Sequence, residues 1–402
     1  MDTRMQMTAP ENRKLTRYFC LLHVSYYCLM AVHTGFFSLM LSRQGLAYDA
    51  IARVATATSI ASLFAPMVLG NLCDRWQLNR MLFVLAAVLA PISYYIIQRT
   101  QSTAGVTICA IVFCCVCVGV QSLPGGWISA LNADRAKINY AFTRSFGSLS
   151  FALVSIVIGV AVEHFGMKCL PLLLAFFGMF IAIFALLLPN QPKPQSRSRD
   201  GAGFRAAMKA LLKNRKFVAL LLGSVLYNIP SGVFFTFFSV YFTQLGGAEG
   251  LLGIAMFVLA VVEVPVMLFY TRLEKKFGVT CLTAIAMCGF GVKNICLSMA
   301  SSPGWAIVCL LLQMFGLGLS IPACQSFVAK NVPAEYSATA QAAAFSVGGL
   351  GMIAANALSS WLVTVTDLRT VFHLTAYFAF AGALIFIIGA GWRNTGRRGE
   401  HV

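Results

Sequence analysis

The amino-acid sequence predicts an all-α membrane protein of twelve transmembrane helices, arranged as two six-helix bundles that repeat one another. Of the 402 residues, 59% are hydrophobic and only 11% are charged, whereas about a quarter of an average soluble chain is charged. The apolar residues fall into runs of roughly twenty, the length that crosses a hydrocarbon core of about 30 Å. Features of the first half of the chain also recur about 200 residues later.

Each apolar run is expected to be a helix. Inside a bilayer every backbone N–H and C=O must find its partner within the spanning structure, and the alternation typical of membrane β-strands is missing. The expected spans are 17–42, 50–71, 80–98, 104–131, 144–162, 169–189, 217–243, 249–270, 280–300, 304–329, 339–364 and 370–392.

The formal charge of +17 is distributed as a topology signal. With the N-terminus in the cytosol, twenty-four of the thirty Lys and Arg residues lie on the cytoplasmic side. Such an excess of Lys and Arg orients membrane proteins, so we expect both termini in the cytoplasm of a bacterial inner membrane and no nucleic-acid partner. Five basic residues lie outside and Lys293 lies within a helix; the five are Arg43, Arg53, Arg99, Lys168 and Arg369.

The longest polar interruption divides the chain into halves. Residues 190–216 are rich in Pro, Ser and basic residues and read as a cytoplasmic linker, in which Phe204 to Lys213 has the pattern of a short amphipathic helix. We therefore expect an N-terminal six-helix bundle over 1–189 and a C-terminal one over 217–402.

An internal repeat supports this division. Several short features recur in register at offsets near 200. Parallel repeats of six helices are typical of transporters with a midplane substrate site and alternating access. The matched features are Phe36-Phe37-Ser38 with Gly45 and Phe237-Phe238-Ser239 with Gly246, Pro66 and Pro265, and Asn71–Arg75 and Thr271–Lys275.

The loop after the second span carries a family resemblance. Residues Gly70 to Arg80 read G-N-L-C-D-R-W-Q-L-N-R, which resembles the G-x-L-x-D-R-x-G-R-[KR] loop of the major facilitator superfamily. Gln77-Leu78-Asn79 departs from that pattern, which has a glycine and basic residues there. The resemblance implies a conformational latch formed by Gly70, Asp74, Arg75 and Arg80; the alternative is an ordinary basic loop.

Four shorter stretches resemble the lactose permease and the related oligosaccharide, nucleoside and phenylpropionate proton symporters. They are residues 30–37, 144–147, 313–315 and 337–341. The resemblance implies an importer that carries a small-molecule substrate together with protons. Such a protein is a monomer surrounded by membrane lipid and needs no cofactor.

The chain departs from the permease at its sugar and proton sites. Arg144 matches the permease's arginine in the fifth helix, but Phe151 replaces its tryptophan and Gly126 stands at the position of its carboxylate. Gln313 and Gly316 stand where the permease has a histidine and its proton-carrying glutamate. A lactose-type site is therefore incomplete here.

Two ionisable residues lie deep within spans, where a charge is costly and indicates function. Glu263 and Lys293 each lie about thirteen residues from their own entry face, so their depths differ by about 10 Å. Because the lysine side chain is long, it could span part of this difference, and the sequence leaves open whether Lys293 pairs with Glu263. We predict Glu263 as the proton carrier, with Lys293 as its partner; the alternatives are substrate contact and a fixed ion pair that braces two helices.

Further polar and aromatic residues are candidates for the solute site, although such residues also join membrane helices without lining a cavity. We predict that His33 takes part in both proton coupling and solute binding. Arg144 either binds solute or extends to the interface. Pro124, Pro230 and Pro322 predict bends. The remaining candidates are Tyr26, Gln121, Trp127, Phe151, Tyr227, Asn228, Gln313, Gln325 and Asn356.

Other function classes find little support. The thirteen cysteines lie mostly within spans without His/Cys ligand spacing, so no metal is expected. No Ser/His/Asp set or nucleotide-binding loop indicates an enzyme. A proton-coupled exporter of drugs or metabolites is the alternative transport function, although the fifth span lacks the proline that such exporters usually carry. A sensor that only binds its solute would be distinguished from a transporter because proteoliposomes containing it would accumulate no solute.

Overall fold

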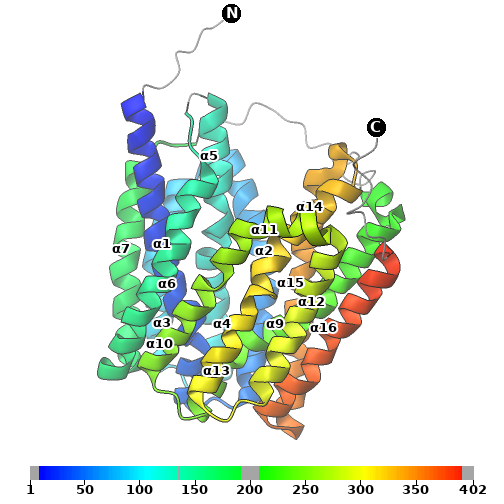
Figure 1. Ribbon diagram of the computed structural model, residues 1–402. Coiled ribbons are helices and arrows are strands. Elements are labelled where there is room, and N and C mark those ends of the chain that lie inside the picture. The colour runs from blue at the N-terminus through cyan, green and yellow to red at the C-terminus, as the bar shows by residue number, and fades with distance from the viewer. Residues whose placement is uncertain (1–8, 135, 192–207, 392–402) are drawn as a thin grey trace, which may run out of the picture. The chain divides into compact units, whose positions relative to one another are not determined.

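The computed structural model describes residues 9–134, 136–191 and 208–391 (Figure 1). These residues hold 12 helices that are long and apolar enough to cross a membrane, and no strand. The predicted multi-pass all-α fold is therefore confirmed. Most of the linker lies outside the described residues, and of the amphipathic segment only 208–213 is described, as helix.

Three of the twelve spans are interrupted and therefore comprise two helices each. The first six spans are α1 (Ala9–Arg43), α2 (Tyr48–Trp76), α3 (Asn79–Arg99), α4 (Thr103–Phe113) with α5 (Leu123–Asp134), α6 (Tyr140–Phe165) and α7 (Leu170–Leu187). The other six are α9 (Arg215–Gln244), α10 (Glu249–Val261) with α11 (Glu263–Phe277), α12 (Val279–Ser298), α13 (Pro303–Leu310) with α14 (Leu317–Asn331), α15 (Ser337–Val365) and α16 (Leu368–Ala390).

The chain forms two compact units. Unit 1 comprises Met1–Leu46, Ala57–Arg197 and Ala248–Phe257, and unit 2 comprises Ala47–Thr56, Ser198–Gly247 and Val258–Val402. The first turns of α2 thus belong with the later helices, and the first turns of α10 with the earlier ones. The predicted bundle boundaries at 189 and 217 remain a prediction.

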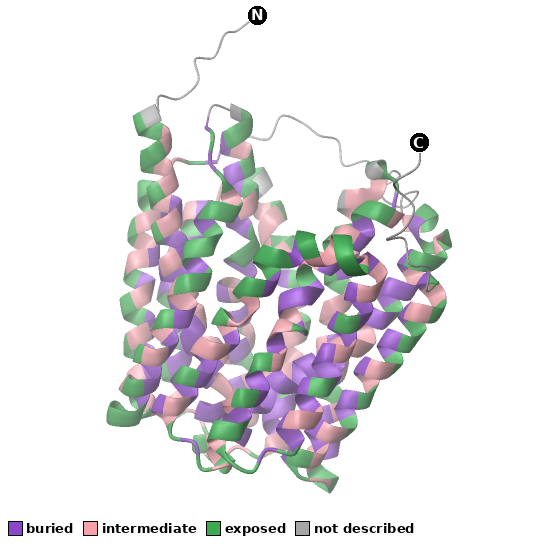
Figure 2. Cartoon of the chain, in the orientation of Figure 1, coloured by how far each residue is buried: buried purple, intermediate pink, exposed green. Residues whose placement is uncertain are grey.

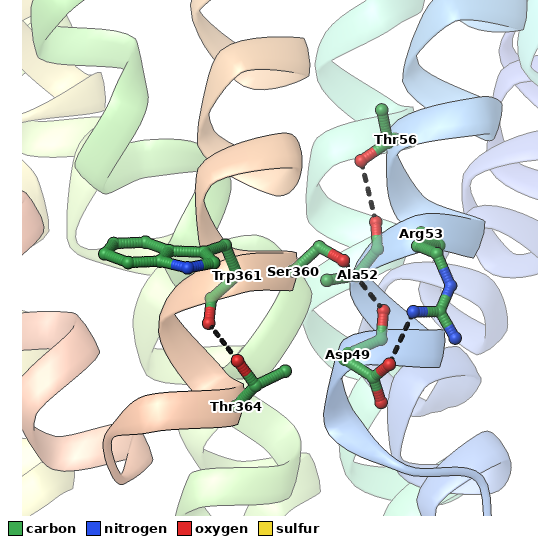
Figure 3. A network of polar contacts seen from close by, with 7 residues as sticks. All are labelled: Asp49, Ala52, Arg53, Thr56, Ser360, Trp361 and Thr364. Atoms are coloured by element: carbon green, nitrogen blue, oxygen red, sulfur yellow. Dashed lines mark hydrogen bonds and ion pairs between the residues drawn. The ribbon is translucent and has the colours of Figure 1, made fainter.

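Contacts within unit 2 explain the place of the first turns of α2. The Ser360 hydroxyl of α15 donates to the Asp49 carbonyl oxygen at 3.3 Å, and Arg53 pairs with the Asp49 carboxylate at 2.5 Å (Figure 3). Gln244 at the end of α9 donates to the Tyr48 hydroxyl at 2.5 Å. Polar contacts therefore join this segment to α9 and α15.

Glycines place the first turns of α10 in unit 1. A Cβ added at Gly253 would lie 2.4 Å from the Ser155 carbonyl oxygen and 3.0 Å from the Gly159 Cα of α6. The Gly250 N–H donates to the Glu163 carboxylate at 2.9 Å, and Arg43 pairs with Glu249 at 2.5 Å. This close approach of two helices through small residues is common in membrane proteins.

Each unit packs its helices in the same order. In unit 1, α1 contacts α6 and α7, and α3 contacts α7 and α4; in unit 2, α9 contacts α15 and α16, and α12 contacts α16 and α13. The corresponding pairs are separated by six spans. The shared order agrees with the internal repeat that the sequence predicts.

The turns that close the first and seventh spans also match in detail. Gly45 and Gly246 adopt left-handed φ values of 85° and 89°, which glycine reaches without a steric cost. Each donates its N–H three residues back, and the next residue donates five residues back, from Leu46 to Leu41 and from Gly247 to Phe242. This is the hydrogen-bond pattern of a Schellman cap, and it confirms the predicted equivalence of these turns.

Buried and exposed apolar residues both mark a membrane protein. Each unit buries large aromatic side chains completely, among them Trp127 and Phe36 in unit 1 and Phe234 and Phe290 in unit 2. Exposed residues occur along the helices (Figure 2). Large apolar side chains are among them, including Phe345, which is 88% exposed. Lipid tails are as apolar as leucine, so such surfaces are stable in a bilayer.

Candidate functional site

The eighth span is interrupted next to its acidic residue. Helix α10 ends at Val261 and α11 begins at Glu263. Pro265 lies four residues after Val261, and a proline ring clashes with the carbonyl four residues before it and removes a hydrogen bond. The break therefore places Glu263 in the first turn of a new helix.

The tenth span is interrupted as well. A 3-10 segment, Leu311–Met314, follows α13, and α14 begins only at Leu317, after Gly316 with φ −79° and ψ −100°. Pro322 again lies a few residues after the break. Gln313 sits within the irregular segment. Interrupted apolar spans are typical of binding sites in transporters.

Two glycines hold these interruptions close together. A Cβ at Gly318 of α14 would lie 3.2 Å from the Glu263 Cα, and a Cβ at Gly289 of α12 would lie 2.6 Å from the Phe315 carbonyl carbon. Since both neighbours are backbone atoms, only glycine fits without a shift of the chain. The two glycines let the broken spans and α12 meet at van der Waals distance.

A buried polar network joins the three elements. The Lys293 Nζ of α12 donates to Gln313 Oε1 at 2.6 Å, and Gln313 Nε2 donates to Glu263 Oε1 at 3.0 Å. Lys293 and Gln313 are completely buried, and Glu263 is partly buried. The Lys293 ammonium also lies 3.5 Å from the centroid of the Phe234 ring, a cation–π contact.

The structure answers the question of pairing that the sequence left open. Glu263 and Lys293 belong to one network, but among the described residues no ion pair joins them. Gln313, predicted only as a solute-binding candidate, connects them. The predicted site residue Tyr227 reaches this network through Phe290. The ring centroids of Tyr227 and Phe290 lie 5.1 Å apart in a stacked arrangement, and the Phe290 centroid lies 5.6 Å from the Lys293 ammonium.

Unit 1 carries its own interruption, within the fourth span. Between α4 and α5 the chain forms a π-helical turn, Cys114–Val118, and a 3-10 turn, Gly119–Ser122. The hydroxyl of Tyr26, a predicted site residue, donates to the Cys117 carbonyl oxygen at 3.0 Å. Tyr26 is buried, so it stabilises the irregular backbone.

We predict that Tyr26→Phe destabilises the protein, because it leaves the buried Cys117 carbonyl without this donor. The expected loss is about 1 to 2 kcal/mol, seen as a lower midpoint of thermal unfolding in detergent. Tyr95→Phe is the matched control, since the Tyr95 side chain is 54% exposed. Equal midpoints for the two variants would contradict the role of Tyr26.

His33 lies in an aromatic cluster of unit 1. Its Nδ1 is 2.8 Å from the Tyr94 hydroxyl oxygen, and its ring centroid lies 4.5 Å from that of Phe113 and 4.9 Å from that of Phe37. His33 is partly exposed, whereas Tyr94 is completely buried. The histidine is thus held by Tyr94, and its role in solute binding or proton coupling stays a prediction.

Arg144 and Phe151 both lie on α6. The Arg144 Nε donates to the Tyr27 hydroxyl at 3.0 Å, and Arg144 is exposed. A Cβ at Gly147 would lie 2.5 Å from the Tyr27 ring, so this glycine makes room for the tyrosine that positions Arg144. Phe151 lies one helical turn after Gly147 and is partly exposed.

Two predicted site residues are buried and make contacts within their own units. Trp127 is completely buried, its indole N–H donates to the Pro189 carbonyl at 3.1 Å, and its ring lies 5.5 Å from Phe19. Asn356 is buried and accepts a hydrogen bond from Thr236 at 2.7 Å. For both residues a solute-binding role stays a prediction.

The other predicted residues remain separate from the network. Asn228 donates to the Ser224 carbonyl within α9, at 2.8 Å. Gln121 and Gln325 are exposed, on the 3-10 turn of unit 1 and on α14. For these three residues a solute-binding role stays a prediction.

The predicted latch residues lie at the junction of α2 and α3. Gly70, Asp74 and Arg75 are in the last turns of α2, Arg75 is exposed, and Arg80 is in the first turn of α3. The Asp74 side chain lies outside the described residues. The family pattern has a glycine at position 77, and here Gln77 takes the left-handed φ of 56°.

We predict that Gln77→Gly stabilises the protein by about 1 kcal/mol, because a left-handed backbone costs a side-chain-bearing residue roughly that much. Thermal unfolding in detergent measures the effect. Asn71→Gly, an exposed helical position in the same segment, should be destabilising by a similar amount. The same sign for both variants would argue against strain at Gln77.

Sequence reasoning missed the residues that shape the network without being polar. Phe234, Gly289 and Gly318 are such residues. Gly318 lies four residues before Pro322, whereas the span of Gly289 contains no proline, so a nearby proline was a signal for Gly318 alone. Sequence reasoning matched Glu274 of α11 to Asp74 in the repeat but did not predict its contacts. Glu274 accepts hydrogen bonds from Ser326 and, at 2.6 Å, from Lys330 of α14.

Comparisons with known proteins agree with this architecture. A family model described as "MFS_1 like family" matches residues 17–380. The maltose permease of Geobacillus stearothermophilus is 25% identical over 259 residues, which cover 64% of either chain. The putative nucleoside transporter YegT of Escherichia coli (strain K12) is 23% identical over 252 residues, 60% of this chain and 58% of that one. The chain thus matches about three fifths of the length of these relatives.

Solved structures show the same fold. The crystal structure of the nucleoside transporter NupG superimposes with a TM-score of 0.81 and 16% identity, over 94% of this chain and all of that one. An autoinhibited peptide transporter of the POT family gives a TM-score of 0.72 at 13% identity, over 96% and 98% of the two chains. These likenesses confirm the major facilitator fold. Since the family model covers most of the sequence, the chain belongs to the MFS_1 like family, a membrane family and not an enzyme family.

Proposed function

We propose that this protein is a secondary active transporter of the bacterial inner membrane, with both termini in the cytoplasm. It imports a small polar solute, a saccharide or a nucleoside, together with protons and by alternating access. The names of the relatives, a maltose permease and a putative nucleoside transporter, support this class of solute. The two six-helix bundles, 1–189 and 217–402, are the moving parts in this proposal.

The observation that carries the proposal is the network of Glu263, Gln313 and Lys293. A carboxyl group at a helix break within a span is costly in a membrane and indicates function. Glu263 keeps an acceptor oxygen whether ionised or protonated, so its hydrogen bond from Gln313 survives either state. We therefore assign Glu263 as the proton carrier and Lys293 as the group that tunes it.

Reconstituted transport tests the proposal. Purified protein in proteoliposomes is supplied with labelled uridine or labelled maltose, and a pH gradient is imposed, acidic outside. We expect accumulation of one of these solutes above equilibrium, and we expect a protonophore to abolish it. Accumulation that persists with the protonophore, or that needs a sodium gradient instead, would exclude proton coupling. Proton-driven extrusion from the vesicles would favour the exporter instead.

A further inference from the structure

The Gln313 amide lies between the charged groups of Glu263 and Lys293. Two hydrogen bonds, of 2.6 and 3.0 Å, run from Lys293 through Gln313 to Glu263. Since no ion pair within 4.0 Å joins Lys293 to Glu263, the charges are bridged and not paired. Opposite charges in a membrane interior attract strongly, so something must hold them apart.

The direction of the amide is fixed by the lysine. An ammonium group only donates hydrogen bonds, so Gln313 must turn its oxygen toward Lys293 and its NH2 group toward Glu263. The other close contact of the ammonium is the Phe234 ring, at 3.5 Å. Lys293 therefore satisfies its charge on Gln313 and Phe234 and leaves Glu263 unpaired.

A direct ion pair would give Glu263 different chemistry. Neutralising one partner of a buried ion pair is strongly unfavourable, because it leaves the other charge uncompensated. A paired Glu263 would therefore stay ionised through the cycle and carry no proton. With Gln313 between them, Glu263 can change its protonation state while Lys293 keeps its partners.

We propose that Gln313 is a positioning residue, a spacer that prevents Glu263 and Lys293 from forming a permanent ion pair and so keeps Glu263 able to exchange a proton. The proposal rests on the proposed role of Glu263. Few other groups act on this carboxyl. Of the described elements packed against α11, α12 brings Lys293, the 3-10 segment brings Gln313, and α14 brings the backbone of Gly318.

Infrared spectroscopy of the purified protein tests the spacer without any solute. A protonated carboxyl group has a carbonyl stretching band, and the band that Glu263→Gln removes belongs to Glu263. The pH at which this band loses half its intensity is measured in the unaltered protein, in Gln313→Ala, in Lys293→Met and in the double variant. Gln101→Ala, at an exposed position between α3 and α4, is the matched control.

The direction in which this midpoint pH shifts decides whether Gln313 acts as a spacer. Without the spacer Lys293 reaches Glu263 directly, so we expect Gln313→Ala to lower the midpoint by about one pH unit or more, a tenfold change in proton affinity. Adding Lys293→Met should reverse this and raise the midpoint above that of the unaltered protein. Gln101→Ala should not move it.

An unchanged or raised midpoint in Gln313→Ala would overturn the proposal, because loss of the amide N–H alone acts in that direction. Should Gln313→Ala fail to fold, Gln313→Ser, whose hydroxyl is too close to the backbone to replace the amide bridge, is read by the same sign. Uptake that proves independent of protons would defeat the proposed function but leave this titration intact, so the two failures are distinguishable.

Discussion

Glu263→Gln should abolish proton-driven accumulation and leave solute exchange across the membrane unchanged. Glutamine has the shape of glutamate and keeps an oxygen that accepts from Gln313 Nε2, the contact that measures 3.0 Å, but it cannot carry a proton. Because one pH unit is worth about 1.4 kcal/mol per proton, a coupled transporter reaches roughly tenfold accumulation per unit of gradient. The variant should only equilibrate.

The measurement uses proteoliposomes and whichever of labelled uridine and maltose the unaltered protein accumulates. Uptake under a pH gradient is compared with exchange against internal unlabelled solute at equal pH. Glu335→Gln, at an exposed position on a short 3-10 turn, is the matched control and should accumulate normally. Full accumulation by Glu263→Gln would refute the assignment of Glu263 as the proton carrier.

Gly289→Ala is expected to destabilise the protein. Its Cβ would lie 2.6 Å from the Phe315 carbonyl carbon and 2.7 Å from the carbonyl oxygen, and no side chain can move aside to relieve this. Overpacking of this kind typically costs about 1 to 3 kcal/mol. Because the contact sets the distance between α12 and the break that carries Gln313, transport should fall as well.

A graded series separates this effect from general sensitivity to alanine. Gly318→Ala, whose Cβ would lie 3.2 Å from the Glu263 Cα, should cost less, and Gly304→Ala, with nothing within 4 Å, should cost nothing. Unfolding midpoints and proton-driven uptake are measured for all three. If Gly289→Ala were as stable as Gly304→Ala, the close packing at this junction would be wrong.

The sequence was sufficient for the fold because membrane spans depend on local properties. Length and hydropathy located all twelve spans, mostly within a few residues of their ends, since every span must satisfy its own backbone. The prolines were less informative. Pro124 and Pro322 follow interruptions as expected, but α9 continues through Pro230 and α2 continues through Pro66. Pro265, recognised only as a repeat marker, follows the break that lies next to Glu263.

The candidate site was predicted only in part, because side-chain contacts depend on how helices rotate and approach. Ionisable residues inside spans are rare, so Glu263 and Lys293 were easily found. Phe234, one of 32 phenylalanines, carries no mark in the sequence that distinguishes it as the partner of a cation. The placing of Gln313 between two charges required the irregular backbone at 311–316, and no periodicity predicts that.

The interruptions of the fourth and tenth spans also bear on the history of the chain. Both occupy the same position in their repeats, at 114–122 and 311–316. If one gene duplicated to give both halves, the ancestral six-helix unit already had a broken fourth helix. The first copy now stabilises its break with the neutral Tyr26, and in the second copy a lysine and a glutamate lie beside the break. The same irregular backbone thus serves a neutral contact in one half of the chain and a charged network in the other.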